Sequence, residues 1–467
     1  MATNYLTRSP GTPTSEKICT YSGWVKVNDT AGSIGLWAQT ASSSGNGTML
    51  FINSSSGLEF YATNGSSQAA RVVTSRKLRD PLAWYLIQCH VDTTQSTAAD
   101  RVKLYVNGTQ ETDLSTSSYP SQNINLNGYD GSGNQIFGSL DNLSFNCKAD
   151  VSDVYFIDGS NIAVTQFWET DATTGQIKPK LDPTIGSFGT NGYHLKFENA
   201  NAGIDSKPSG ASNFSTTGTI RQQVDTPSNL FCTLNPMQRS RMNTNNFGDY
   251  LSVGNNTFDT SSSNGIRAIV NGTIGAQSGK WYWEAKVITN TRMQIGISTG
   301  LEQKFPQAYY DETEYSAMTL NLNGTFTGRY TGSAIDEFAT GTANTTNDIL
   351  GFALDMDNKA LYIHKNGTYL SNGSNTGVPT SGSARTGSLI ESFAGSRDDY
   401  FPTGEFMFPV MMDLSTTGVA KAEFNFGNGF FGTTAVSSAG TNASGFGVFE
   451  YDVPTGYTAL CTKGLNE

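Results

Sequence analysis

The strongest constraint on the fold is one short string that occurs twice, in distant parts of the chain. Residues 100–110 read DRVKLYVNGTQ, and residues 357–370 read DNKALYIHKNGTYL. Each string follows an apolar run that ends in Asp, places Leu and a β-branched residue on one face, and closes with Asn-Gly. Asn and Gly tolerate the positive φ of tight hairpin turns. The repetition predicts the same antiparallel hairpin in two separate sheets. A solenoid is not indicated, because nothing recurs a third time.

The composition is typical of an all-β chain. Charged residues make up only 15% of the 467 residues, below the roughly 25% of ordinary globular proteins. Aromatic residues nevertheless reach 11%, whereas disordered chains are poor in them because they have no core to fill. Short apolar runs between Gly-, Ser- and Asn-rich turns therefore predict two tandem antiparallel β-sandwiches with little helix.

A polar stretch separates two sets of period-two runs. In the first half, Tyr85, Ile87, Cys89 and Val91 share one face of a predicted strand, and in the second half Trp281 and Trp283 do so. The Gly-, Ser- and Asn-rich residues between the two sets read as a linker. The predicted division is a sandwich at 1–200, a linker at 201–225 and a sandwich at 226–467.

Charge and cysteine usage exclude several classes of protein. The net charge is −11 without a basic stripe, so no nucleic-acid partner is expected. No run of 18 apolar residues and no apolar signal core at MATNYLTRSPG occur, so neither membrane insertion nor secretion is expected. The five cysteines are odd in number and lack CxxC spacing. A disulfide framework is therefore not predicted, and Cys89 is predicted to be a buried thiol.

The second half resembles a SPRY domain. Four groups of residues carry the resemblance in the order typical of that family: GKWYWEAKV (279–287), IGIS (295–298), GFALDMDNKALYIHKNG (351–367), and MFPVMMD (407–413) with FNFG (424–427). The resemblance covers roughly residues 270–467. It implies a SPRY-like β-sandwich whose variable loops form a binding surface.

The first half resembles a laminin-G-like, concanavalin-like jelly roll. The similar segments are GWVKV (23–27), WYLIQCHVDTT (84–94), RVKLYVNGTQ (101–110) and SDVYFIDG (152–159). Together with YLTRSPG at the start and DTPSNLFCTLNP between the halves, the arrangement resembles virion proteins of marine tailed bacteriophages. That resemblance implies a non-enzymatic structural protein, made in the host cytoplasm and displayed on the particle as a head decoration, a fibre or part of the tail.

The same resemblance implies the partners. They are other virion proteins of the capsid or tail, and a host-surface glycan is the candidate ligand. Fibre-like virion proteins are commonly homo-oligomers, and we expect one here, although no heptad run or collagen period indicates it.

Enzyme chemistry is not indicated. A retaining glycoside hydrolase needs two carboxylates about 5 Å apart, and on a strand these commonly occur as Glu-x-Asp-x-x-Glu, which this chain lacks. His90, His194 and His364 are isolated in predicted strands. No Gly-x-Ser-x-Gly elbow before a helix and no phosphate loop occur. The alternatives to the virion hypothesis are a glycan-active hydrolase on the same scaffold and a non-viral carbohydrate- or peptide-binding module.

No cofactor is predicted. Zinc would need clustered His or Cys residues, which the spacing does not provide. The loop NGYDGSGN (127–134) offers the hard oxygens that calcium prefers, but without the ligand spacing of an EF-hand. Calcium is therefore the one alternative to an ordinary polar turn at this loop.

Aromatic residues in loops are the candidate binding residues. Loops on a rigid sandwich are a common place for recognition. Aromatic rings cover the apolar faces of sugars, and neighbouring carboxylates accept hydroxyl protons. The other interpretation is that these rings pack against the sheet or a second subunit. The candidates are Tyr309, Tyr310, Tyr315, Arg329, Tyr330, Asp398, Asp399 and Tyr400. By contrast, Trp24, Trp84, Trp281 and Trp283 have the spacing of core residues.

Overall fold

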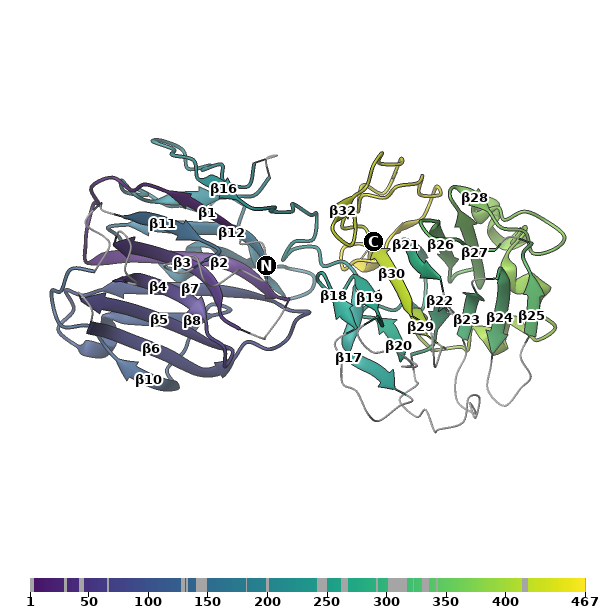
Figure 1. Ribbon diagram of the computed structural model, residues 1–467, viewed down its shortest axis with the longest axis horizontal. Coiled ribbons are helices and arrows are strands. Elements are labelled where there is room, and N and C mark those ends of the chain that lie inside the picture. Colours follow the sequence, from purple (N-terminus) through teal and green to yellow (C-terminus); the bar gives the residue numbers. More distant parts are fainter. Residues whose placement is uncertain are drawn as a thin grey trace. The chain divides into compact units, whose positions relative to one another are not determined.

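A computed structural model of the chain contains two compact units, residues 1–222 and 223–467 (Figure 1). The structure describes residues 4–28, 32–41, 46–64, 67–126, 131, 133–139, 149–181, 183–198, 201–241, 250–261, 268–290, 293–300, 317–321, 323–329, 336–341, 343–413 and 419–466. Nearly all pairings between the described strands are antiparallel, and the described helices are short. The prediction of an all-β chain with two tandem sandwiches is therefore confirmed.

The N-terminal unit packs an eight-stranded sheet against a six-stranded sheet. The eight-stranded sheet has the order β10 (Leu114–Ser118), β6 (Ser67–Lys77), β5 (Gly57–Asn64), β4 (Asn46–Ile52), β3 (Ile34–Ala41), β11 (Asn134–Phe137), β1 (Tyr5–Arg8) and β16 (Ser215–Thr217), which runs from bottom to top in Figure 1. The six-stranded sheet has the order β15 (Tyr193–Leu195), β12 (Ala149–Asp158), β2 (Ile18–Val27), β7 (Trp84–Asp92), β8 (Val102–Val106) and β9 (Thr109–Gln110).

Side chains from both of these sheets form one core, since alternate residues of each strand face inward. Trp37 and Phe156, on opposite sheets, stack with ring centroids 4.9 Å apart. The remaining elements of the unit are the hairpin of β13 (Trp168–Thr170) and β14 (Ile177–Pro179) and the 3-10 turns η1 (Ala98–Asp100) and η2 (Val164–Gln166).

The C-terminal unit is a second sandwich. Its seven-stranded sheet has the order β17 (Leu234–Arg241), β20 (Ala268–Gly272), β29 (Phe408–Asp413), β22 (Met293–Ser298), β23 (Ala317–Asn321), β24 (Thr325–Arg329) and β25 (Asp336–Ala339). Its eight-stranded sheet has the order β18 (Leu251–Ser252), β19 (Thr257–Asp259), β30 (Ala420–Asn425), β21 (Lys280–Asn290), β26 (Ile349–Asp355), β27 (Ala360–Lys365) and β28 (Thr368–Tyr369), with β33 (Thr458–Ala459) parallel to β21.

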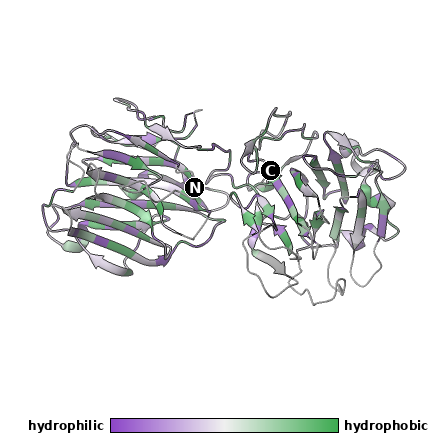
Figure 2. Cartoon of the chain, viewed as in Figure 1, coloured by the Kyte–Doolittle hydropathy of each residue, from purple (hydrophilic) through white to green (hydrophobic). Residues whose placement is uncertain are grey.

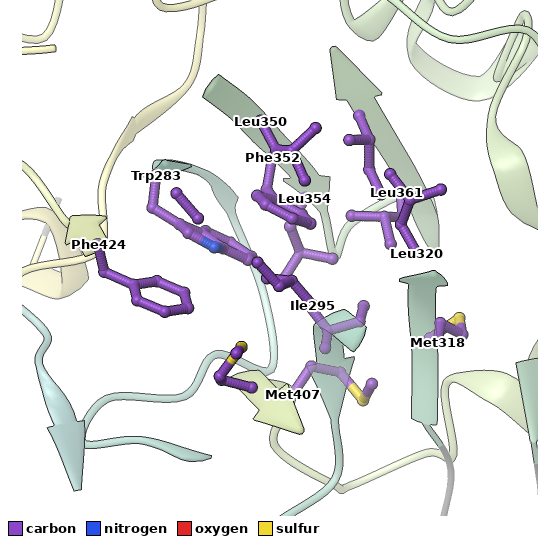
Figure 3. Packing of buried hydrophobic residues seen from close by; sticks show 14 of the residues in the cluster. Trp283, Ile295, Met318, Leu320, Leu350, Phe352, Leu354, Leu361, Met407 and Phe424 are labelled. Atoms are coloured by element: carbon purple, nitrogen blue, oxygen red, sulfur yellow. The ribbon is translucent and has the colours of Figure 1, made fainter. Parts of the chain in front are cut away.

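Buried apolar side chains fill the space between these two sheets. Figure 3 shows Trp283, Phe352 and Phe424 facing Ile295 and Met407. Trp283 and Phe352 stack with centroids 5.3 Å apart. Hydrophobic and hydrophilic residues both occur along single strands of the two units, as period-two strands require (Figure 2). The short elements are the β31–β32 hairpin (Phe430–Phe431 and Thr434–Ala435), η3 (Pro379–Ala384), η4 (Leu389–Ser392), α1 (Arg397–Tyr400) and η5 (Gly464–Asn466).

The repeated string forms equivalent hairpins in both units, as predicted. β8 turns into β9 at Asn107-Gly108, and β27 turns into β28 at Asn366-Gly367, all four residues with positive φ. The side chain of each Asn also accepts a hydrogen bond from the backbone of the neighbouring strand that precedes it in sequence. Leu86 N donates to Asn107 Oδ1 over 2.9 Å, and Ile349 N donates to Asn366 Oδ1 over 2.8 Å. The Asn therefore joins three strands, which explains why the string keeps it in both copies.

The predicted linker at 201–225 is wrong for most of its length. Residues 201–222 belong to the N-terminal unit, and β16 pairs with β1 at the edge of the sheet. Phe214 is buried in the core, with the Arg8 guanidinium 4.6 Å from its ring centroid. Asp205 pairs with Arg8 through a 3.3 Å contact. The polar composition misled the prediction because a few long-range contacts, those of Asp205 and Phe214 with Arg8, hold the segment on the unit while most of its other polar residues stay exposed.

The described cysteines and tryptophans agree with the sequence in part. Cys89 and Cys232 are buried, and burial raises the pKa of both thiols, that of Cys232 to about 11. Cys147 lies outside the described residues. Trp281 and Trp283 are in the core as predicted. Trp24 lies on the outer face of the six-stranded sheet, because its neighbour Val25 faces the core. Lys26, two residues after Trp24, lies on that same outer face, and so does Trp84, which pairs with Lys26 across the strands. Among the described residues, no helix combines the length and apolarity needed to cross a bilayer.

His90 gives the N-terminal unit a predicted dependence on pH. Burial and the neighbouring Lys103 lower the pKa of His90 to about 4. The unfolded chain takes up a proton below pH 6.5 while the folded unit stays neutral, so stability falls as the pH drops from 6.5 toward 4. Between pH 7.5 and 5 we expect His90 to lower the free energy of unfolding by about 2 kcal/mol. Urea unfolding of wild type and His90→Gln at both pH values measures this difference. Equal pH slopes in the two proteins would contradict it.

Candidate functional site

The structure describes only part of the predicted loop surface. Tyr309, Tyr310, Tyr315 and Tyr330 lie outside the described residues. Arg329 is the last residue of β24, and only its backbone is described. The described candidates are therefore Asp398, Asp399 and Tyr400, which lie together on α1.

The two aspartates of α1 have local partners. Ser396 begins the helix with a capping box, in which Asp398 N donates to the Ser396 side chain and Ser396 N donates to Asp399 Oδ2 over 2.9 Å. Asp398 is exposed and pairs with Lys359, which lowers the pKa of the Asp398 carboxyl. Asp399 thus serves the helix terminus, while Asp398 lies at the surface beside a lysine.

Tyr400 is a core residue and not a surface contact. It is fully buried, and its hydroxyl donates to Asp336 Oδ2. Its ring packs on Phe393, with centroids 4.8 Å apart, and passes so close to Gly328 that a Cβ there would lie 2.8 Å from the ring. The ring is buried because its one polar atom finds a carboxylate inside the unit. Asp336 is the first residue of β25.

Paired charges make up the rest of this region. Glu391 accepts from Arg385 over 2.7 Å and from Arg397 over 3.2 Å. Exposed pairs of this kind contribute little stability and leave the charges accessible. The described part of the predicted surface therefore presents paired charges, without the exposed aromatic ring that the sugar-binding mechanism needs.

The described residues contain no group of three His, Cys, Asp or Glu that could hold a metal ion. Most of the candidate calcium loop, residues 127–130 and 132, lies outside them.

A second surface, which was not predicted, crosses the N-terminal unit. One residue from each strand of the eight-stranded sheet joins a continuous line of cross-strand pairs on the outer face. We call this line the outer row. Its members are Ser118, Arg71, Tyr61, Met49, Ala38, Ile136, Thr7 and Ser215. Because neighbouring strands lie about 4.8 Å apart, eight strands make the row about 34 Å long.

Three aromatic rings cover the middle of the outer row. Tyr5, Phe51 and Tyr61 are partly buried and pack on an apolar cluster of Ala38, Met49 and Ile136, separate from the core between the sheets. Tyr5 lies two residues from Thr7 on β1, and Phe51 lies two residues from Met49 on β4, so both belong to the same outer face. The rings therefore form an apolar strip that is still reachable from solvent.

Polar groups flank this strip. Arg71 forms a two-bond pair with Glu59, at 2.7 Å and 3.3 Å, and Asn53 donates to the same carboxylate over 2.8 Å. The Glu59 contact raises the pKa of Arg71. Donors and acceptors thus lie beside Tyr61, which pairs with Arg71 across the strands.

A sequence signal for the outer row does exist. Strands β4 and β5 contain LFI and FYA, in which residues of both faces are apolar or aromatic. A strand with one face in the core and one face in water should alternate with polar residues. Phe51 and Tyr61 break that alternation, and this departure indicates a second apolar surface.

Known families match both halves of the chain. The concanavalin A-like lectin/glucanases superfamily model matches residues 2–154, and the SPRY domain model matches residues 280–382. The chain therefore carries an N-terminal concanavalin-like domain and a C-terminal SPRY domain. Domains of these types indicate a carbohydrate- or protein-binding module. No curated protein matches the chain.

Solved structures that match the chain include the SPRY domain of human HERC1, at 12% identity and a TM-score of 0.26, covering 41% of this chain and 96% of that one. Domains LG4-5 of the mouse laminin alpha1 chain match at 8% identity and a TM-score of 0.28, covering 91% of this chain and 86% of that one. A heptameric SAP-like pentraxin from Limulus polyphemus matches at 14% identity and a TM-score of 0.26, covering 35% of this chain and 74% of that one.

Proposed function

We propose that this protein is a non-enzymatic glycan-binding structural protein of a tailed-bacteriophage particle. The observation that carries the glycan-binding part is the strip of partly exposed rings, Tyr5, Phe51 and Tyr61, on the outer face of the concanavalin-like domain. The match of that domain to a superfamily of lectins and glucanases supports the same ligand class.

The chemistry of the outer row suits an extended sugar chain. Aromatic rings cover the C–H faces of sugars, while hydroxyl groups exchange hydrogen bonds with neighbouring polar side chains. Arg71 supplies donors next to Tyr61, and the buried Glu59 carboxylate balances its charge and holds it in place. A rigid sheet holds all of these groups without loop ordering, so less free energy is lost on binding.

The virion part of the proposal rests on the resemblance of the whole arrangement to marine phage virion proteins. The protein would be made in the host cytoplasm and assembled as a homo-oligomer with other capsid or tail proteins. Its glycan ligand would lie on the host surface. Immunogold labelling of purified particles tests this part, and gold found only in cell lysate would count against it.

Tyr61→Ala is expected to weaken binding of the full chain to a neutral polysaccharide about tenfold, because a stacking partner worth roughly 1 kcal/mol or more is lost. Affinity electrophoresis in gels containing a panel of neutral polysaccharides measures the change. Phe406→Ala removes an aromatic ring that is 47% exposed in the other domain, and it should leave binding unchanged. Equal mobility of wild type and Tyr61→Ala in every gel would refute the assignment.

The absence of catalysis is tested with the same polysaccharides. We expect no release of reducing sugar. Release that disappears in Asp398→Ala would replace the binding proposal with a hydrolase.

A further inference from the structure

An open pocket of about 380 Å³ lies at one end of the outer row. Ser215 of edge strand β16 is both the last member of the row, paired with Thr7, and part of the pocket wall. The pocket therefore shares one residue, Ser215, with the surface on which the proposed function rests. The segment that forms it, residues 201–222, is the one that the sequence presented as a linker.

The pocket is lined by both amide or hydroxyl side chains and apolar side chains. The polar side chains are Asn201, Ser215, Thr216 and Gln222, and the apolar ones are Ala202, Phe214 and Ile220. None of these seven residues is ionisable. Amides and hydroxyls both donate and accept, so together they match a ligand whose hydroxyl groups do the same. The apolar side chains suit the C–H face of a sugar ring, and the absence of charged side chains among the seven favours a neutral ring.

Internal hydrogen bonds hold the wall in place before any ligand arrives. Asn201 Oδ1 accepts from Gly203 N over 2.9 Å and from Thr216 Oγ1 over 3.2 Å. Both contacts use the amide oxygen and neither uses the amide nitrogen, which can donate. Phe214 N donates to Gly203 O over 2.8 Å, and Gln222 Nε2 donates to Phe197 O over 2.7 Å. A wall fixed in this way loses little conformational freedom on binding.

Phe214, which lines the pocket, is held by the core of the sandwich. Phe214 is buried, and it packs against Tyr193 edge to face, with centroids 5.0 Å apart. The Arg8 guanidinium lies over the Phe214 ring at 4.6 Å. The ring is thus held between a core aromatic and a buried cation, and its position is fixed by the interior of the sandwich.

We infer that this pocket binds one neutral sugar residue, at the end of a glycan chain that lies along the outer row. This inference rests on the proposed function and adds the position and charge of the terminal residue to it. A volume of about 380 Å³ is at the small end of ligand sites, which suits a single ring.

The double variant Ser215→Ala/Thr216→Val tests the inference. It removes two hydroxyl groups from exposed positions and keeps the shape of the strand. We expect the full chain to bind neutral oligosaccharides about tenfold more weakly by isothermal titration calorimetry, as the loss of two hydrogen bonds predicts. Thr434→Val is the matched control, since Thr434 is an exposed threonine on strand β32 of the C-terminal unit, which carries neither the pocket nor the outer row. It should leave the affinity unchanged.

The outcomes separate the pocket from the row. If Tyr61→Ala weakens binding and the double variant does not, the pocket inference is overturned while the proposed function stands. If the double variant weakens binding and Tyr61→Ala does not, the pocket is supported and the aromatic strip is not the site. A second measurement compares methyl glycosides of neutral hexoses with the corresponding uronic acids by saturation-transfer NMR. Stronger signals from the acids would overturn the assignment of a neutral residue.

Discussion

Arg8→Ala is expected to lower the free energy of unfolding of the N-terminal unit by about 3–5 kcal/mol, the usual cost of removing one partner from a buried ion pair. The Arg8 side chain is only 5% exposed and the Asp205 side chain is fully buried. Arg8 also donates to Gln135 Oε1 over 2.7 Å and to the carbonyls of Ser212 and Asn191 over 2.5 Å and 2.7 Å. Burial lowers the pKa of Arg8. Alanine leaves a buried carboxylate and several carbonyls without this donor.

Urea titration of the full chain, followed by hydrogen exchange and mass spectrometry of peptides from residues 1–222, measures the loss in the unit concerned. Lys103→Ala is the control, because Lys103 pairs with Asp100 at the surface and should cost less than about 1 kcal/mol. The exchange pattern should also change in a defined place. Residues 201–217 should lose protection first, since Arg8 holds Ser212 and Asp205 against β1. A loss similar to that of the control would contradict the role given to Arg8.

Glu284→Gln is expected to destabilise the C-terminal unit by about 2–5 kcal/mol at pH 8. Glu284 is fully buried, and all four of its partners are donors: Glu450 N and Tyr451 N at 2.9 Å each, Tyr282 O–H at 3.1 Å and Asn425 Nδ2 at 3.3 Å. Burial raises the pKa of Glu284 to about 7 against the effect of these hydrogen bonds. At pH 8 the group is ionised and accepts all four. A glutamine keeps only one accepting oxygen, so the two donors that contacted the other oxygen face an NH₂ group instead. Each of these unsatisfied donors costs roughly 1–3 kcal/mol.

The hydrogen bonds of Glu284 also set the tautomer of a buried histidine. The Tyr282 hydroxyl donates to Glu284, so its oxygen accepts from His364 Nε2 over 2.7 Å. His364 Nδ1 then accepts from Gly367 N over 3.1 Å. In Glu284→Gln, hydrogen exchange should rise at residues 450–451, and Glu391→Gln, at an exposed ion pair, is the control. Unchanged exchange at residues 450–451 would show that the carboxylate is not what holds this segment.

Local patterns predicted the fold well wherever neighbouring residues decide the structure. Asn107-Gly108 and Asn366-Gly367 specify their turns without help from distant residues, because few other residue types adopt positive φ without cost. Period two identified the inward faces of most strands. Trp24 is buried as predicted, but on the face of the six-stranded sheet away from the core between the sheets, a distinction that alternation cannot make where both faces carry apolar residues.

The candidate site was harder to predict, because its parts come from distant segments. Thr7 and Ser215 are paired neighbours in the folded sheet but lie at opposite ends of the N-terminal unit in sequence. Strand order decides that pairing, and hydrophobic alternation carries no information about strand order. Tyr400 was misplaced for a related reason. Its burial depends on Asp336, a residue far away in the sequence whose carboxylate accepts a hydrogen bond from the Tyr400 hydroxyl.

The pairing of β1 with β16 also has a topological consequence for the N-terminal unit. Tyr5 lies opposite Thr217, so the polypeptide enters and leaves this sandwich on adjacent strands. A domain whose two ends meet can be inserted into a loop of an unrelated protein, or circularly permuted, without interrupting its sheets. Recombination can therefore transfer this unit from one polypeptide to another while both of its sheets, and the surface they carry, stay intact.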